Sequence, residues 1–370
     1  MDDSNTNRIS KPVFLFCVAC FIQSATMLSV YVVGLTEQDS WAALLFAAVL
    51  YLPVLAVLLT LIRKFPDKGL FELNEAAFGK VGGAVVSGVY VLFFYFLTTL
   101  NLNSAGRFVK QTIMTNTPIE VLNICYIALA AYAISKGFNV IGRYATFFSF
   151  LSLAVISFSI FATSQIFDVR NFLPLFDKEP MRYVQSTHIL LTIPLGELVC
   201  MLVIAPYVKR NKPGLGKEFL WGYIVGLVAF LAVLIRDAGV LGNTIGYFSL
   251  PAFQTLKLAR VADTLGHLEI LLATVLIVLI YFRIALLFFC MTVMLAKIVR
   301  VKNLKFLVIS TASMVLTYSF FIFQRSTDRI LYNTSVTPFL WTVVEILLPV
   351  TTLMVLAVRG KLSHGAAGKG

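Results

Sequence analysis

The sequence predicts an all-α membrane protein with about ten transmembrane helices. Hydrophobic residues make up 59% of its 370 positions and charged residues only 13%, whereas a soluble domain is about half apolar and about a quarter charged. The apolar residues gather in blocks that can cross a hydrocarbon core roughly 30 Å thick, a length that takes about 20 residues of helix. Because lipid offers no hydrogen bonds, each block must satisfy its own backbone polar groups, which favours helices.

Ten such blocks form a single transmembrane domain, residues 1–370. The predicted spans are residues 13–33, 41–62, 84–102, 121–134, 140–162, 184–208, 220–241, 268–296, 304–323 and 336–358. A polar stretch, residues 163–182, separates the fifth span from the sixth. The eighth span is long enough to tilt in the bilayer.

Basic residues between the spans predict the orientation. With the N-terminus inside, the inner loops and termini hold 19 Lys and Arg residues and the outer loops hold 10, Arg236 among them. This positive-inside pattern places both termini in the cytoplasm. The same distribution accounts for the net charge of +12, since the basic residues lie in short loops between apolar blocks. We therefore expect the lipid bilayer, and no nucleic acid, as a partner.

Residues suited to metal binding or covalent catalysis are sparse. Cys17 and Cys20 form a C-x-x-C pair, but a metal site needs two further ligands nearby, and none follows. All five cysteines lie in apolar blocks, where cysteine behaves as a small hydrophobe. The sequence contains no catalytic triad, zinc-protease motif or phosphate-binding glycine loop. We expect no metal, no cofactor and no enzymatic activity.

Five spans on either side of the polar stretch predict an inverted repeat, with residues 13–162 as one half and residues 184–358 as the other. An odd number of spans in each half makes the halves antiparallel in the membrane. Secondary transporters of this design bind their solute near the midplane, where the first helix of each half is interrupted. Spans one and six are therefore the expected site.

The sixth span carries Pro194, Gly196 and Glu197 in the middle of an apolar run. Proline removes a backbone donor and glycine loosens the helix, so together they free backbone groups for a ligand. A carboxylate near the bilayer centre is costly and usually faces a cavity or a partner. Glu197 belongs either to a ligand site or to a structural pair at a kink.

The first span carries Gln23, Ser24, Ala25 and Thr26 at its centre. Small hydroxyl residues line ligand sites, and they also let helices pack closely. Both interpretations stay open for this segment.

Two further charges lie deep in the predicted membrane core. Arg283 is at least two turns from either end of the eighth span, too deep to reach water by snorkelling alone. Glu345 lies at a similar depth in the tenth span, so Arg283 has two candidate partners, Glu197 and Glu345. The pair is either structural, or Arg283 supplies a fixed positive charge where some transporters place sodium.

Aromatic and hydroxyl residues in the third and eighth spans complete the candidates. Tyr95 and Thr99 share one face of the third span because they are four residues apart. In one hypothesis Tyr95 gates a pocket together with Tyr281. In the other, both rings serve ordinary helix packing.

The run Pro194-Leu195-Gly196-Glu197 resembles the P-x-G-E motif of the spore germination permease family. These proteins are the B subunits of nutrient germinant receptors, within the amino acid–polyamine–organocation transporter superfamily. The loop at residues 65–82 and the segment at residues 251–269 are similar to the family's sequences after the second span and before the eighth. Together with the ten-span plan, the resemblance covers most of the chain.

The resemblance implies a LeuT-like fold with broken helices one and six, and a nutrient pocket between spans one, three, six and eight. It also implies a complex with a larger A subunit and a lipoprotein C subunit in the inner spore membrane. Family members often have glycines at the break in span one, where this chain has Gln23 to Thr26. By position, the ligand-binding residues would be Ser24, Ala25, Thr26, Tyr95, Thr99, Gly196, Glu197, Cys200 and Tyr281.

Three functions follow from these observations. The first is a receptor subunit that binds an amino acid or similar nutrient and triggers germination. The second is a working secondary transporter, proton-coupled or facilitative, for amino acids or related small polar solutes. The third, from another class, is a membrane-embedded enzyme or scaffold.

Overall fold

The computed structural model describes residues 8–209, 214–259, 268–301, 303–323 and 325–360. Within these ranges the chain is helical, apart from turns, loops and an isolated parallel bridge between Ile9 and Val208. Ten helical stretches of the described chain are long and apolar enough to cross a membrane. The predicted all-α membrane fold is therefore confirmed.

Residues 8–163 form α1 (Lys11–Gln23), η1 (Ser24–Leu28), α2 (Val30–Thr36), η2 (Glu37–Asp39), α3 (Ser40–Lys64), α4 (Leu70–Thr112), α5 (Ile119–Lys136) and α6 (Phe138–Thr163). The remaining described residues form η3 (Val169–Phe172), α7 (Pro180–Leu190), η4 (Leu191–Leu195), η5 (Gly196–Cys200), α8 (Met201–Ile204), η6 (Ala205–Tyr207), α9 (Gly216–Leu241), η7 (Gly242–Tyr247), α10 (Pro251–Leu258), α11 (Leu268–Val299), α12 (Leu304–Phe321), α13 (Ser326–Ser335), α14 (Thr337–Thr342), η8 (Val343–Leu347) and α15 (Leu348–Val358).

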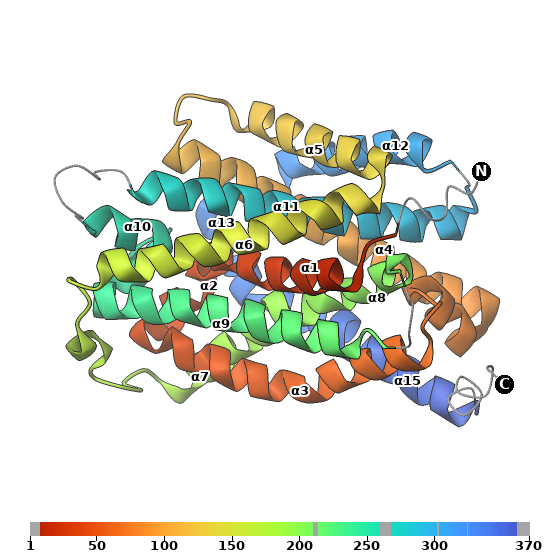
Figure 1. Cartoon of the computed structure of the whole chain (residues 1–370), viewed down its shortest axis with the longest axis horizontal. Helices are drawn as coiled ribbons and strands as arrows, with labels where there is room; N and C mark the ends of the chain where they lie inside the picture. The colour runs from red at the N-terminus through yellow and green to blue at the C-terminus, as the bar shows by residue number, and fades with distance from the viewer. Residues whose placement is uncertain (1–7, 210–213, 260–267, 302, 324, 361–370) are drawn as a thin grey trace.

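The long helices lie side by side along the long axis of the molecule (Figure 1). Within this bundle α1 packs against α9 and α6, while α11 packs against α4 and α6. The start of α1 and the end of α15 lie toward the same end of the long axis, on the right in Figure 1. The two ends of the bundle sequence lie toward the same end of the axis because the number of spans is even.

Close contact between α1 and α9 depends on two glycines four residues apart. A Cβ atom at Gly222 would lie 2.4 Å from the Leu15 carbonyl oxygen, and one at Gly226 would lie 2.7 Å from Cβ of Ile22. Lipid is as apolar as the helix surfaces, so helices associate through close packing of this kind. The two glycines fix the position of α1, and with it the first half of span one.

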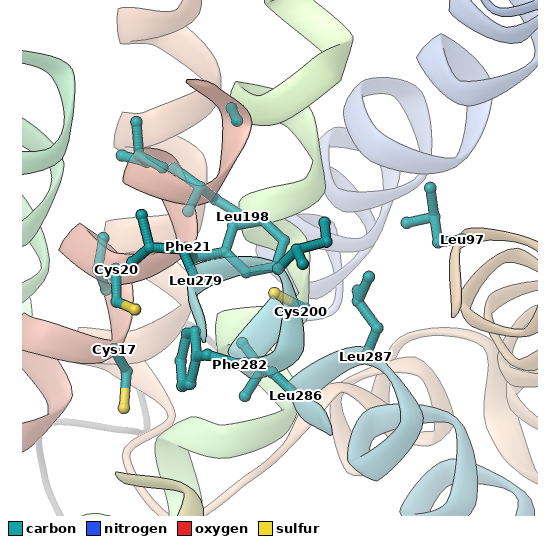
Figure 2. Close-up of a cluster of buried hydrophobic side chains, with 14 of the residues drawn as sticks. Cys17, Cys20, Phe21, Leu97, Leu198, Cys200, Leu279, Phe282, Leu286 and Leu287 are labelled. Carbon is teal, nitrogen blue, oxygen red and sulfur yellow. The ribbon is translucent and has the colours of Figure 1, made fainter. Parts of the chain in front are cut away.

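The centre of the bundle is apolar and closely packed. Figure 2 shows Phe21 of α1, Leu198 and Cys200 of η5, and Leu279 and Phe282 of α11 gathered in one cluster, and all five are buried. Spans one, six and eight thus meet at their midpoints. Two charged residues of the interior, Glu197 and Arg283, lie on these same elements.

One basic residue that the sequence assigned to an outer loop lies inside a helix in the structure. Arg236, assigned to an outer loop, lies inside α9 and is 2% exposed. Its guanidinium donates to Asp237 Oδ1 at 2.6 Å and 2.9 Å and to Ser159 Oγ at 2.5 Å. Arg236 therefore belongs to a buried ion pair and does not report the orientation, and its removal from the outer count strengthens the asymmetry.

Candidate functional site

The sixth span is interrupted where the sequence predicted a break. After Leu190, α7 passes into the π-helical turn η4, in which Ile193 has non-helical angles (φ −110°, ψ 108°). The peptide bond between Ile193 and Pro194 is cis. The chain then continues as the 3-10 turn η5, with Glu197 in its first turn.

The first span changes helix type without leaving the helical region. Residues Ser24–Leu28 form the 3-10 turn η1, and Ser24 itself has φ −61° and ψ −20°. The Ser24 hydroxyl donates to the Phe21 carbonyl oxygen at 2.5 Å. Span one is thus tightened at its centre, where glycines would have allowed it to unwind.

Arg283 of α11 joins the two interrupted spans. Its Nη2 donates to Glu197 Oε2, while its Nη1 donates to the Phe21 carbonyl oxygen at 3.2 Å and to Ser24 Oγ at 3.1 Å. The guanidinium also lies 4.3 Å from the centroid of the Phe21 ring. The side chains of Arg283 and Glu197 are 0% and 1% exposed. Of the two candidate partners, Arg283 takes Glu197, and we call this pair the central ion pair.

Glu345 lies in the π-helical turn η8 and is fully buried. Neither of its carboxylate oxygens accepts a hydrogen bond from any residue that the structure describes. A Cβ atom at Gly196 would lie 2.2 Å from Glu345 Oε2, so the carboxylate rests directly on the backbone of span six. A residue larger than glycine has no room at this contact.

A narrow cavity opens beside Glu197, with a volume of about 20 Å³ for the centre of a water molecule, so its walls must move apart to admit a larger ligand. We call it the ligand cavity. It is lined by Leu28, Tyr31, Leu97, Leu100, Asn101, Ser104, Ile193, Glu197, Asn333 and Trp341. Apolar walls with a few polar groups are typical of sites for small molecules. The polar groups include the Glu197 carboxylate and the Asn101 side chain, whose buried Oδ1 has no hydrogen-bond partner in the described chain.

Four of the predicted ligand residues lie at or near this region. Glu197 lines the ligand cavity, and Ser24 and Gly196 contact the charged groups, Arg283 and Glu345 respectively. Thr26 lines a neighbouring cavity formed with Leu250 and Pro251.

The other predicted residues contact different parts of the bundle. Ala25 is buried in η1, and the Cys200 carbonyl lies 3.7 Å from Cys290 Sγ. Thr99 donates to the Tyr95 carbonyl oxygen at 2.9 Å, which is within its own helix.

The two tyrosines of the gate hypothesis bind to different helices. Tyr95 donates its hydroxyl to the Met314 carbonyl oxygen of α12 at 3.2 Å and stacks on Tyr318. Tyr281 donates to the Leu129 carbonyl oxygen of α5 at 3.3 Å. The structure does not bring their hydroxyl groups to a shared contact.

Two lining residues come from the last part of the chain, which the sequence did not connect with the site. Asn333 lies in α13, which folds back against the bundle, and its Nδ2 donates to the Tyr31 hydroxyl at 3.1 Å. Trp341 lies in α14 and packs edge-on against Phe93 at a centroid distance of 4.9 Å. The cavity is therefore bounded by spans one, three, six and ten. The resemblance had implied span eight in place of span ten.

A second cavity continues from the ligand cavity and shares Tyr31 and Ser104 with it. It is also narrow, with a volume of about 30 Å³ for the centre of a water molecule, and is lined in part by Arg107 and Arg329. Arg329 donates to Ser104 Oγ at 2.7 Å, and Arg107 donates to Asn103 Oδ1 at 2.9 Å. Two guanidinium groups thus face the route to the ligand cavity and make its entrance electropositive.

Residues of the polar stretch close over the same end of the molecule. Lys178 Nζ lies 3.0 Å from Glu37 Oε2, and this hydrogen bond raises the pKa of the lysine. Asp39 accepts hydrogen bonds from the Phe176 backbone N–H at 2.8 Å and from the Tyr183 hydroxyl at 2.7 Å. We call these contacts the polar-stretch contact, because they hold residues of the polar stretch against η2.

The described chain contains no group of three or more His, Cys, Asp or Glu side chains arranged to hold a metal ion.

Comparison with known proteins shows which family has this architecture. A model of the spore germination protein family matches residues 8–329 of the chain. The chain belongs to this family. Two family members from Bacillus subtilis strain 168 are similar along much of their length. Spore germination protein YfkT is 22% identical over 90% of both chains, and spore germination protein KB is 21% identical over 78% of both.

Solved structures show the same fold at low identity. Mhp1, a nucleobase-cation-symport-1 family transporter in a closed conformation with bromovinylhydantoin bound, matches with a TM-score of 0.70. It is 15% identical, and the match covers 98% of this chain and 82% of Mhp1. MhsT in complex with L-phenylalanine has a TM-score of 0.53 and 12% identity, covering 91% of this chain and 97% of MhsT. This spore germination family member is therefore an integral membrane protein with the LeuT-like fold that the resemblance implied.

Proposed function

We propose that the chain is the membrane subunit of a nutrient germinant receptor, which binds a small nutrient in the ligand cavity and triggers germination. The observation that carries the proposal is the position of that cavity. It lies beside Glu197 at the break in span six, and Arg283 joins Glu197 to the centre of span one.

The nutrient class follows from the cavity walls. Glu197 and the free Oδ1 of Asn101 are hydrogen-bond acceptors, which suit the ammonium group of an amino acid or a similar polar donor. Leu97, Leu100 and Trp341 supply apolar contacts for the rest of a small molecule.

Ligand binding would act through the central ion pair. A ligand cation beside Glu197 weakens the hold of this carboxylate on Arg283, which also binds the Phe21 carbonyl oxygen and Ser24. The ligand then favours one arrangement of spans one and six over another, as it must in order to shift a conformational equilibrium. Larger A subunits and lipoprotein C subunits, in the inner spore membrane, would read this change.

The test replaces wall residues in spores that carry the chain in its native complex. Leu100→Phe fills the ligand cavity, whereas Leu92→Phe adds the same ring on the outward face of the same helix, where Leu92 is 59% exposed. We expect Leu100→Phe to raise the nutrient concentration for half-maximal germination at least tenfold and Leu92→Phe to leave it unchanged, at equal protein levels. Equal dose–response curves for both variants would remove the cavity from nutrient binding.

A second measurement separates the receptor from a transporter. The purified chain, without partner subunits, is reconstituted into proteoliposomes and tested with labelled amino acids. We expect binding without concentrative uptake. Robust accumulation of solute by the chain alone would contradict the receptor proposal.

A further inference from the structure

Three ionisable side chains share the interior of the bundle, and their charges do not balance. Glu197 and Glu345 are carboxylates, and Arg283 is the cation that interacts electrostatically with both. All three are buried, with 1%, 0% and 0% exposure. Two negative groups therefore face one positive group in the buried centre of the bundle.

Arg283 is already committed to one of the two carboxylates. Its terminal nitrogens bond to Glu197, Ser24 and the Phe21 carbonyl oxygen, and Glu345 receives no hydrogen bond from it. Glu345 also forms no salt bridge with any other described residue. The carboxylate is in contact with Gly196, which offers no side chain.

Among the described residues that interact electrostatically with Glu345, only Arg283 carries a positive charge. The ionisable groups that interact with it are Tyr51 of α3, Tyr90 of α4, Glu197 of η5 and Arg283 of α11. Tyr51 and Tyr90 are both fully buried, and their hydroxyl groups have no hydrogen-bond partner in the described chain. None of these groups except Arg283 carries a positive charge.

An isolated ionised carboxylate in such surroundings costs far more free energy than a protein can supply, and the group becomes neutral instead. We propose that Glu345 is a proton-binding site: the cluster of Glu197, Arg283 and Glu345 holds one proton, on a carboxylate oxygen of Glu345, while Arg283 is paired with Glu197. Protonated Glu345 has one O–H donor and rests as a neutral group against Gly196.

Release of this proton to water would leave two carboxylates competing for one guanidinium. Arg283 would then be drawn from Glu197 toward Glu345, and its bonds to the Phe21 carbonyl oxygen and Ser24 would be disturbed. Proton occupancy at Glu345 is thereby linked to the arrangement of spans one and six. This site goes beyond the proposed nutrient binding and does not depend on it.

The test is infrared spectroscopy of the full chain in lipid nanodiscs, without any nutrient. A protonated carboxylic acid has a carbonyl stretching band, sensitive to D2O, that an ionised carboxylate lacks. We expect this band in the native chain at neutral pH and in Glu179→Gln, a control at an exposed carboxylate. We expect Glu345→Gln to lose it.

Glu197→Gln supplies a second and more specific readout. With Glu197 neutral, Arg283 balances Glu345 alone, so Glu345 no longer needs its proton and the band should weaken or disappear. Absence of the band from the native chain at neutral pH would overturn the proposal, whether or not the variants fold. Persistence of the full band in Glu345→Gln would overturn it as well, and either result would leave the nutrient-binding proposal standing.

Discussion

Among the individual residues, Arg283 connects the most parts of the site. It binds a carboxylate from span six, a backbone carbonyl oxygen and a hydroxyl from span one, and the face of the Phe21 ring. Three spans therefore depend on one side chain. A guanidinium suits this position because its donors are spread in a plane and it stays charged when buried.

Replacing Arg283 tests this dependence. Arg283→Met leaves Glu197 as a buried and unpaired carboxylate, and removal of one partner of a buried pair costs about 3–5 kcal/mol. Adding Glu197→Gln should recover part of the loss, because the double variant contains no unpaired charge at this position. Unfolding of both variants in mixed micelles with increasing SDS measures the difference. If the double variant were no more stable than Arg283→Met, the central ion pair would not be the source of the loss.

Gly196 gives a second test at the scale of one atom. Gly196→Ala places a methyl group 2.2 Å from Glu345 Oε2, so the carboxylate or the backbone must move, and overpacking of this kind costs about 1–3 kcal/mol. Gly88→Ala is the matched control, because no atom lies within 4 Å of its added methyl group. We expect Gly88→Ala to be neutral or to stabilise α4 by up to about 1 kcal/mol. Unfolding midpoints that fall equally in both variants would contradict the close contact.

The choice of partner for Arg283 shows what a sequence leaves open at this scale. Glu197 and Glu345 lie at similar depth, so hydropathy cannot separate them. The decision depends on the rotation of each helix about its axis, which the π-helical turns η4 and η8 change locally. Such turns leave no periodic pattern in the sequence.

Among the elements, the spans and their interruptions were the most predictable features. Long apolar blocks marked the spans, and Pro194 with Gly196 marked the break in span six. The folding back of α13 was not predictable, because it is a polar helix between two spans and its Asn333 meets Tyr31 only through tertiary packing. The signal that could have pointed to the cavity was the run of polar residues at the end of span three, Thr98, Thr99, Asn101 and Asn103, of which Asn101 lines the cavity.

The polar-stretch contact yields a prediction about pH. The pKa of Lys178 is raised by its bond to Glu37, so the bond stabilises the folded loop below the unfolded value of about 10.4 and is lost as the pH rises through the raised value. We expect a spin label at Arg170→Cys, in a background without other cysteines, to be immobile from neutral pH to about pH 10 and mobile above that.

Lys178→Gln should make the same label mobile at neutral pH. A label whose mobility is the same at all these pH values in both backgrounds would show that the Lys178–Glu37 bond does not restrain the polar stretch.

For the whole molecule, the even number of spans and the distribution of basic loops predict that both termini lie in the cytoplasm. Cysteines placed at Arg8 and Lys305 should react with a membrane-impermeant maleimide only after the membrane is opened, and a cysteine at Arg170 should react in intact cells. All three positions are exposed in the structure. Reaction of the Arg8 cysteine in intact cells would reverse the predicted orientation. The family and the fold were predictable because both depend on the order and spacing of the ten spans along the sequence. The cavity walls were not predictable, because they depend on how individual side chains pack.

The central ion pair also bears on how relatives of this chain can diverge. Glu197 and Arg283 satisfy each other inside the bundle, so a change in either one alone leaves a buried charge, and the two should be exchanged together or not at all across the family. The apolar wall residues carry no charge that needs a partner, so each can be replaced singly. These residues are Leu97, Leu100 and Trp341. Under the proposed function, new nutrient preferences would arise by single substitutions in the cavity wall, while the central ion pair would be inherited unchanged.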